Sequence, residues 1–130
     1  MRDGGDLLVL IVEADSELAA RWADEIERMG AESLWASGRT AAVHALQQRD
    51  VTLIVLNLGL PDDGAFAVAD FASYARPDAK VLFVSASDML TDGSVFRYAA
   101  NACGFVGAES PPEDIAAMAL FHGAKRPGKG

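Results

Sequence analysis

The sequence predicts a doubly wound α/β fold, in which helices cover both faces of a parallel sheet. Two observations carry this prediction. Short apolar runs alternate with longer amphipathic stretches, and the runs are continuously apolar instead of alternating with polar residues. Continuous apolar runs suit strands that are buried on both faces of a sheet. The expected strands are 7–12, 32–36, 51–56, 79–84 and 104–106.

The stretches between these runs show helical spacing. Leu18, Trp22, Ile26 and Met29 recur every three or four residues, and Gly30 follows as a stop signal. Prolines and acids at the start of the last stretch suit a first helical turn. The remaining expected helices are 39–48, 65–74, 94–101 and one that begins near 112 and ends before Gly123.

Length and composition predict one globular domain. The chain has 130 residues, 51% of them hydrophobic and 23% charged. We expect the domain to span 7–123, with a flexible N-terminus at 1–6 and a flexible basic, glycine-rich tail at 124–130. No apolar run approaches the roughly 20 residues that a membrane span needs. The single Cys103 forms no internal disulfide, which is consistent with a cytoplasmic location.

The charge balance argues against nucleic-acid binding. The formal net charge is -8. Affinity for nucleic acids comes largely from Lys and Arg that neutralise phosphates, and the short basic tail is too small to offset the acidic body.

Polar residues follow the expected strands in a recognisable order. Asn57 comes directly after the third run, and the loop Leu58-Gly59-Leu60-Pro61-Asp62-Asp63-Gly64 follows it. The other strand ends carry Glu13-Ala14-Asp15, Ser85 and Gly104-Phe105-Val106-Gly107-Ala108-Glu109. Over about 8–121, this order resembles that of response-regulator receiver domains, the CheY-like family. The resemblance implies a flavodoxin-like (βα)5 doubly wound sheet of five parallel strands, with strand order 2-1-3-4-5.

The resemblance also implies which residues would carry phosphorylation. In the family, two acids after the first strand hold Mg²⁺, an aspartate after the third strand accepts the phosphoryl group, and a lysine after the fifth pairs with it. Here Ala14 stands for the second acid, Asn57 for the aspartate and Ala108 for the lysine. A carboxamide carries no charge and is no nucleophile, and alanine offers no metal ligand. We therefore expect a pseudo-receiver that is not an enzyme, has no catalytic residue and binds no Mg²⁺.

Several residues of this corner allow more than one interpretation. Glu13 and Asp15 could form a weak residual cation site, or Asp15 could cap the first helix. Ser85 and Phe105 match the pair that switches orientation in the family, or they serve as a loop cap and as packing. Phosphorylation at Asp62 or Asp63 in the loop is a further alternative.

The resemblance implies a role in bacterial two-component, or phosphorelay, signalling through protein–protein contacts. The expected partners are a histidine kinase, a phosphotransferase, another regulator or a second copy of the chain. Receiver domains use the face made by the fourth helix, the fifth strand and the fifth helix. In this sequence that face carries Phe96, Tyr98, Ile115, Met118 and Phe121. The alternative function is a small-ligand-binding module that uses the degenerate phosphorylation pocket.

Overall fold

The computed structural model describes residues 7–61, 64–85 and 101–124. In these residues one parallel sheet has the order β2-β1-β3-β4-β5. Its strands are β1 (Leu8–Val12), β2 (Glu32–Ala36), β3 (Leu53–Asn57), β4 (Lys80–Ser85) and β5 (Ala102–Gly107). The flavodoxin-like fold and the strand order 2-1-3-4-5 are therefore confirmed.

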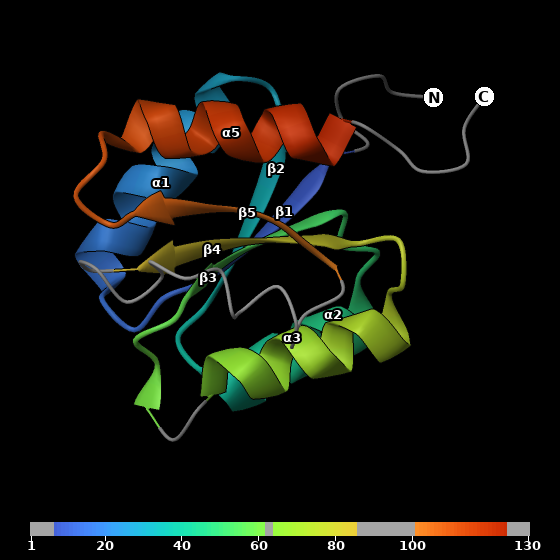
Figure 1. Cartoon of the computed structure of the whole chain (residues 1–130). Coiled ribbons are helices and arrows are strands. Elements are labelled where there is room, and N and C mark those ends of the chain that lie inside the picture. Colours follow the sequence, from blue (N-terminus) through green and yellow to red (C-terminus); the bar gives the residue numbers. More distant parts are fainter. Residues whose placement is uncertain (1–6, 62–63, 86–100, 125–130) are drawn as a thin grey trace.

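Helices cover both faces of this sheet. They are α1 (Ser16–Arg28), α2 (Arg39–Gln48), α3 (Gly64–Ala75) and α5 (Pro112–Ala124). Figure 1 shows α1 and α5 on one face and α2 and α3 on the other. Most of the helix expected at 94–101 lies outside the described residues, as do the expected N-terminus 1–6 and all of the expected tail 124–130 except Ala124, which is the last residue of α5. No described helix is long and apolar enough to cross a membrane.

Each face of the sheet has its own hydrophobic core. Alternate residues of one strand enter different cores, as when Leu10 packs with α2 and α3 while Ile11 packs with α1 and α5. Trp22 and Ile26 fill the α1/α5 core and are fully buried. The buried strand ends are thereby held in fixed positions along one edge of the sheet.

Two helix ends differ from the sequence expectation. Met29 is the C-cap of α1 and is 40% exposed, so the inward face ends at Ile26. The helix α5 continues through Gly123, which was expected to begin the tail. A Cβ at Gly123 would lie 3.3 Å from a Leu7 side-chain carbon and 3.4 Å from Leu53 Cβ. Glycine therefore allows a close approach of this helix to the sheet.

Candidate functional site

The sheet register brings the polar strand ends together. Val12 pairs with Leu56, Asn57 pairs with Val84, and Ser85 pairs with Gly107. Because all strands are parallel, the residues that follow them gather at one edge, where this class of fold places its functional groups. The site is thus the carboxyl edge of β1, β3, β4 and β5.

Glu13 and Asn57 contact each other directly at the centre of this edge. The Asn57 amide nitrogen Nδ2 donates to Glu13 Oε1 at 2.5 Å. Glu13 is only 4% exposed, and its second oxygen, Oε2, accepts from the backbone N–H of Asp15 at 2.9 Å. The Glu13 backbone is also fixed, since its carbonyl accepts from Trp35 Nε1 at 2.7 Å. Both carboxylate oxygens of this buried acid are therefore engaged by protein donors.

The other end of the Asn57 carboxamide is used as well. Its oxygen Oδ1 accepts from the backbone N–H of Gly59 at 2.7 Å. The turn is tight, because a Cβ at Gly59 would lie 3.1 Å from Asn57 Oδ1. An aspartate here could accept from Gly59 but could not donate to Glu13. The donor end of the carboxamide is thus what joins β3 to the end of β1.

Asp15 caps the first helix. Its Oδ1 accepts from the backbone N–H groups of Glu17 at 3.0 Å and Leu18 at 3.3 Å. These donors have no intrahelical partner at a helix start, so the cap stabilises α1. Ala14 is exposed and has no side-chain donor or acceptor. The carboxylate of Asp15 therefore acts on the helix, and Ala14 adds no ligand.

The donor set of this corner does not fit a divalent ion. No group of three or more His, Cys, Asp or Glu residues within the described ranges could hold a metal. Divalent ions such as Mg²⁺ require several oxygen ligands in near-octahedral geometry. The Glu13 carboxylate is hydrogen-bonded to Asn57, and both of its oxygens already accept hydrogen bonds.

Ser85 at the end of β4 and Phe105 within β5 lie in different environments. Ser85 is 2% exposed, and its hydroxyl has no hydrogen-bond partner in the described part of the chain. The Phe105 ring stacks on Phe83, with centroids 5.5 Å apart and an interplanar angle of 17°. Phe105 packs beside the α2/α3 core, whereas the Ser85 hydroxyl is a buried polar group without a described partner.

Ala108 occupies the lysine position of the motif without its chemistry. Its backbone N–H donates to the Ser85 carbonyl at 2.8 Å, and its side chain packs beside the α1/α5 core. The next residue carries a charge of the opposite sign to lysine. The Glu109 carboxylate folds over Gly107, and a Cβ at that glycine would lie 2.9 Å from Glu109 Oε2. A carboxylate thus lies beside the end of β5.

The expected interaction face is only partly described. Phe96 and Tyr98 lie outside the described residues, as do Asp62 and Asp63. Phe121 is 59% exposed and Met118 is half-buried, but Ile115 is fully buried. The expectation that Ile115 contributes to the interaction face is therefore wrong, because its side chain is not accessible to a partner. The helix α5 is apolar nearly all round, so its sequence does not distinguish the side that packs on the sheet.

The sequence did not indicate the hydrogen bond between Trp35 and Glu13. Trp35 was expected only as part of the strand 32–36, yet its indole N–H donates to the backbone carbonyl of Glu13. Register could have indicated its position, because Trp35 pairs with Ile11, two residues before Glu13. Its hydrogen bond depends on a side-chain conformation that the sequence does not specify.

Solved structures with the same architecture identify the fold. A CheY-like response-regulator receiver domain protein from Methanospirillum hungatei JF-1 superposes with a TM-score of 0.77 at 21% identity, covering 91% of this chain and 96% of that one. The receiver domain of a LuxO repressor protein from Vibrio parahaemolyticus gives a TM-score of 0.79 at 18% identity, covering 91% and 90%. The chain has the receiver-domain fold.

The receiver fold is established here by structure and not by sequence. No protein-family model matches the chain, and no curated protein matches it. A response regulator from Thermotoga maritima has the same fold at 15% identity and a TM-score of 0.77, covering 92% of this chain and 98% of that one. Identities this low show a common fold, so the function must be argued from the site residues.

Proposed function

We propose that this chain is a pseudo-receiver, a non-enzymatic module of two-component or phosphorelay signalling that acts through protein contacts without being phosphorylated. One observation carries the proposal: the Asn57 amide donates to the buried Glu13 carboxylate. In the receiver motif a metal ion joins the acid at the end of β1 to the phosphoacceptor. Here a direct hydrogen bond joins the two positions.

The missing groups all serve the same reaction. Phosphoryl transfer needs a nucleophile, a cation to neutralise the phosphoryl oxygens and usually a divalent ion. Asn57 stands in place of the nucleophile, and Ala108 stands in place of the cation. Ala14 stands in place of the second acid that would help to hold the divalent ion. We infer that neither phosphorylation nor Mg²⁺ binding is part of the function.

Surfaces then carry the signal. We propose that a histidine kinase, a phosphotransferase or another regulator docks on the exposed side of α5, where Phe121 is 59% exposed beside the half-buried Met118. Large exposed aromatic side chains are frequent anchors at protein interfaces. Such partners would place the protein in the bacterial cytoplasm.

Intact-mass measurement after incubation with acetyl phosphate and Mg²⁺ tests the absence of phosphorylation. We expect no phosphoryl adduct on the wild-type chain, and little on Asn57→Asp, because the cation and the second acid are still missing. The matched variant carries Asn57→Asp, Ala14→Asp and Ala108→Lys together, and we expect it to gain one phosphoryl group. A stable adduct on the wild-type protein would overturn the proposal.

A second candidate function is favoured by Ser85. Its hydroxyl is buried without a described hydrogen-bond partner, and such groups cost stability unless a ligand or water satisfies them. A small ligand in the degenerate pocket would supply that partner. A thermal-shift screen of small polar metabolites tests this candidate, since a ligand that binds the folded state raises the melting temperature. Mg²⁺ with beryllofluoride should leave it unchanged.

A further inference from the structure

Among the described residues, the strand β2 has one side without a neighbouring strand. It is an edge strand, and its neighbour in the described sheet is β1. The Glu32 N–H donates to the Leu7 carbonyl, and the Ala36 carbonyl accepts from the Glu13 N–H, so these two residues face β1. Backbone groups alternate in direction along a strand. The N–H and C=O groups of Ser33 and Trp35 therefore point away from β1, along the outer side.

This edge strand has no proline, no lysine and no bulge, three features that often prevent strand pairing. The sequence of β2 is Glu-Ser-Leu-Trp-Ala, and its register with β1 runs without interruption from Leu8↔Glu32 to Val12↔Ala36. The opposite edge strand, β5, contains Gly104 and has an irregular register with β4 between Val81 and Leu82. Of the two edges, β2 is the regular one.

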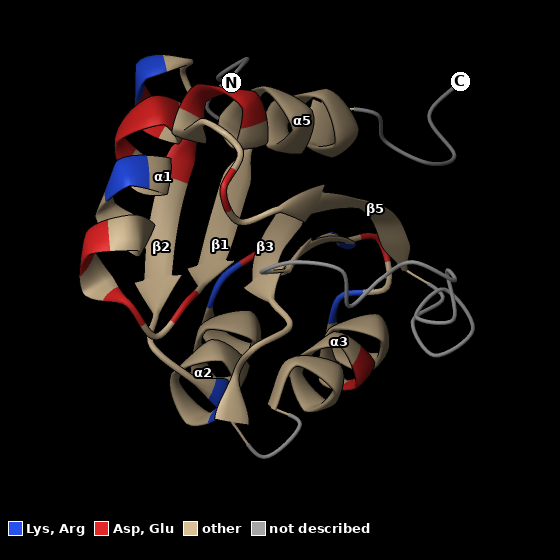
Figure 2. Cartoon of the chain, turned by 60° about the vertical axis from the view of Figure 1, so that its left-hand side comes forward, with Lys and Arg blue, Asp and Glu red and all other residues tan. Residues whose placement is uncertain are grey.

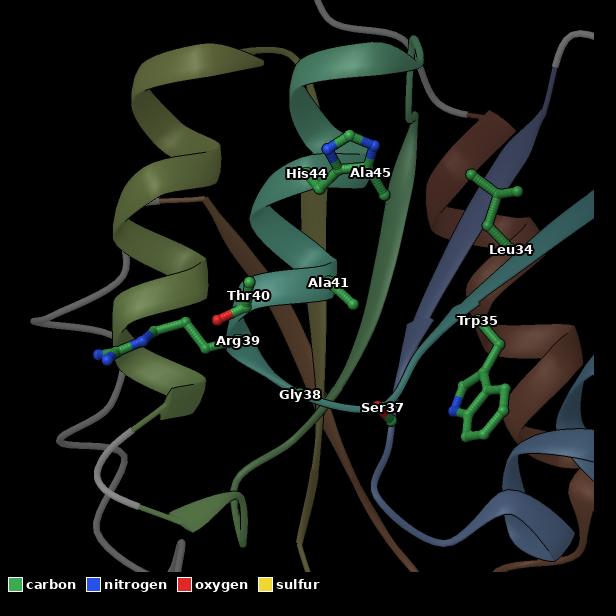
Figure 3. A pocket seen from close by; sticks show the side chains of 9 residues that line it. All are labelled: Leu34, Trp35, Ser37, Gly38, Arg39, Thr40, Ala41, His44 and Ala45. Carbon is green, nitrogen blue, oxygen red and sulfur yellow. The ribbon is translucent and has the colours of Figure 1, made fainter.

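Apolar side chains lie beside the edge on both faces of the sheet. On the α2 side, Leu34, Ala41, His44 and Ala45 are among the residues that line a pocket of about 730 Å³ (Figure 3). On the α1 side, Trp35 is 51% exposed while its indole N–H is held by Glu13. Another strand beside β2 would cover both sets of side chains at once.

We propose that a second copy of this chain pairs with β2 in antiparallel orientation, about a two-fold axis at Leu34. In this register Ser33 of one copy lies opposite Trp35 of the other. Both residues point outward, so their N–H and C=O groups satisfy each other across the axis. Glu32 lies opposite Ala36, and no like charges face each other. The edge is thus self-complementary, as an isologous dimer requires.

The charge distribution favours this surface for self-association. The chain carries a net charge of -8, so most of its surface repels a second copy. The helix α2 contains Arg39 and His44 but no Asp or Glu, whereas α1 carries four acids and two arginines (Figure 2). A two-fold axis normal to the sheet brings the two α2 helices toward each other on one face and the two α1 helices on the other, so the α2 side is the one that favours contact. The small side chains of Ala41 and Ala45 leave room for that approach.

Cross-linking and light scattering test the dimer. In a Cys103→Ala background, Leu34→Cys places the only thiol on the axis, in a non-hydrogen-bonded pair with Cα atoms about 4.5 Å apart, which is within disulfide reach. We expect mild oxidation to give a covalent dimer. The matched control is Tyr74→Cys in the same background, on α3 and 84% exposed, which should stay monomeric.

A second experiment keeps Cys103 and introduces a proline that should prevent pairing along the outer side of β2. Ser33→Pro removes an outward N–H and an exposed hydroxyl that donates to Glu27 Oε2, but it removes no bond to β1, and proline is tolerated at such edge positions. We expect light scattering across a concentration series to show a dimer, and this variant to raise its dissociation constant at least tenfold with an unchanged circular dichroism spectrum. Phe121→Lys on α5 should leave the dimer intact.

Three outcomes would overturn the inference. They are a monomer at every concentration with no cross-link at position 34, a dimer that survives Ser33→Pro, and a dimer that Phe121→Lys abolishes. The inference does not depend on the phosphorylation state, because no residue of the edge takes part in that test.

Discussion

At the scale of single residues, the Glu13–Asn57 hydrogen bond makes Asn57 the residue that the buried Glu13 requires. Asn57→Asp would place two carboxylates in contact where one is 4% exposed. We expect this change to lower the free energy of unfolding by about 1–3 kcal/mol, through the lost hydrogen bond and like-charge repulsion. Urea denaturation at neutral pH without divalent ions measures the loss.

An exchange of the two groups provides the control. Glu13→Gln combined with Asn57→Asp keeps one amide and one carboxylate. The glutamine introduced at position 13 can still accept from Asp15 N–H, and the aspartate introduced at position 57 can still accept from Gly59 N–H. We expect the double variant to recover most of the stability that Asn57→Asp loses, giving a favourable interaction energy in a double-mutant cycle. Mg²⁺ should raise the melting temperature of Asn57→Asp but not that of the wild type. Equal stability of wild type and Asn57→Asp would contradict this account.

The thiol of Cys103 gives a second prediction at this scale. Burial raises the pKa of this thiol from 9.0 to about 11, and nearby Lys80 only partly opposes the shift. Since the thiolate is the reactive form, this higher pKa lowers the thiolate fraction of Cys103 at pH 8 by about a hundredfold. We expect alkylation by iodoacetamide to be at least that much slower than for an exposed thiol. The rate should rise about tenfold per pH unit up to near pH 11.

The exposed comparison is Tyr74→Cys in the Cys103→Ala background. Its labelling rate should level off at about pH 9, near the ordinary pKa of a free thiol. A wild-type rate that also levels off there would show that burial does not raise the pKa of Cys103.

At the scale of elements, the start of α1 depends on Asp15. Its side chain accepts from two backbone N–H groups of the first turn. We expect Asp15→Ala to lower the free energy of unfolding by about 1 kcal/mol. Asp15→Ser keeps a capping oxygen without the charge and should retain most of the stability. If serine were as damaging as alanine, the carboxylate would have a role other than capping.

The sequence predicted the elements better than the contacts between them. Burial on both faces of a parallel sheet leaves a readable pattern of apolar runs, and α2 was expected over the residues at which it occurs, 39–48. Apolar residues occur nearly all round α5, so the sequence could not show that Ile115 is buried and Phe121 is exposed. The Glu13–Asn57 hydrogen bond also could not be predicted from the sequence, because it depends on side-chain conformations and on the register of β1 and β3. What the sequence did supply was the set of polar residues that the strands bring to one edge.

At the scale of the whole molecule, one sheet divides two cores. Successive residues of β1, β3 and β4 enter opposite cores, so neither core can lose its strands while the other keeps them. This sharing of backbone is what makes the unfolding of a small domain cooperative. The two faces should therefore unfold in a single transition.

Two core substitutions on opposite faces test that coupling. Leu46→Ala removes a fully buried side chain from the α2/α3 core, and Ile115→Ala does so in the α1/α5 core. Each should lower the free energy of unfolding by about 2–4 kcal/mol, and the two losses should add, because the residues lie on opposite sides of the sheet. Gln47→Ala, at an exposed position beside Leu46, is the control and should change stability by less than about 0.5 kcal/mol.

In a Trp35→Phe background, fluorescence reports the buried Trp22 on the α1/α5 face alone. Leu46→Ala, on the other face, should then shift the fluorescence midpoint and the circular dichroism midpoint equally, whereas two separate midpoints would mean that the faces unfold independently.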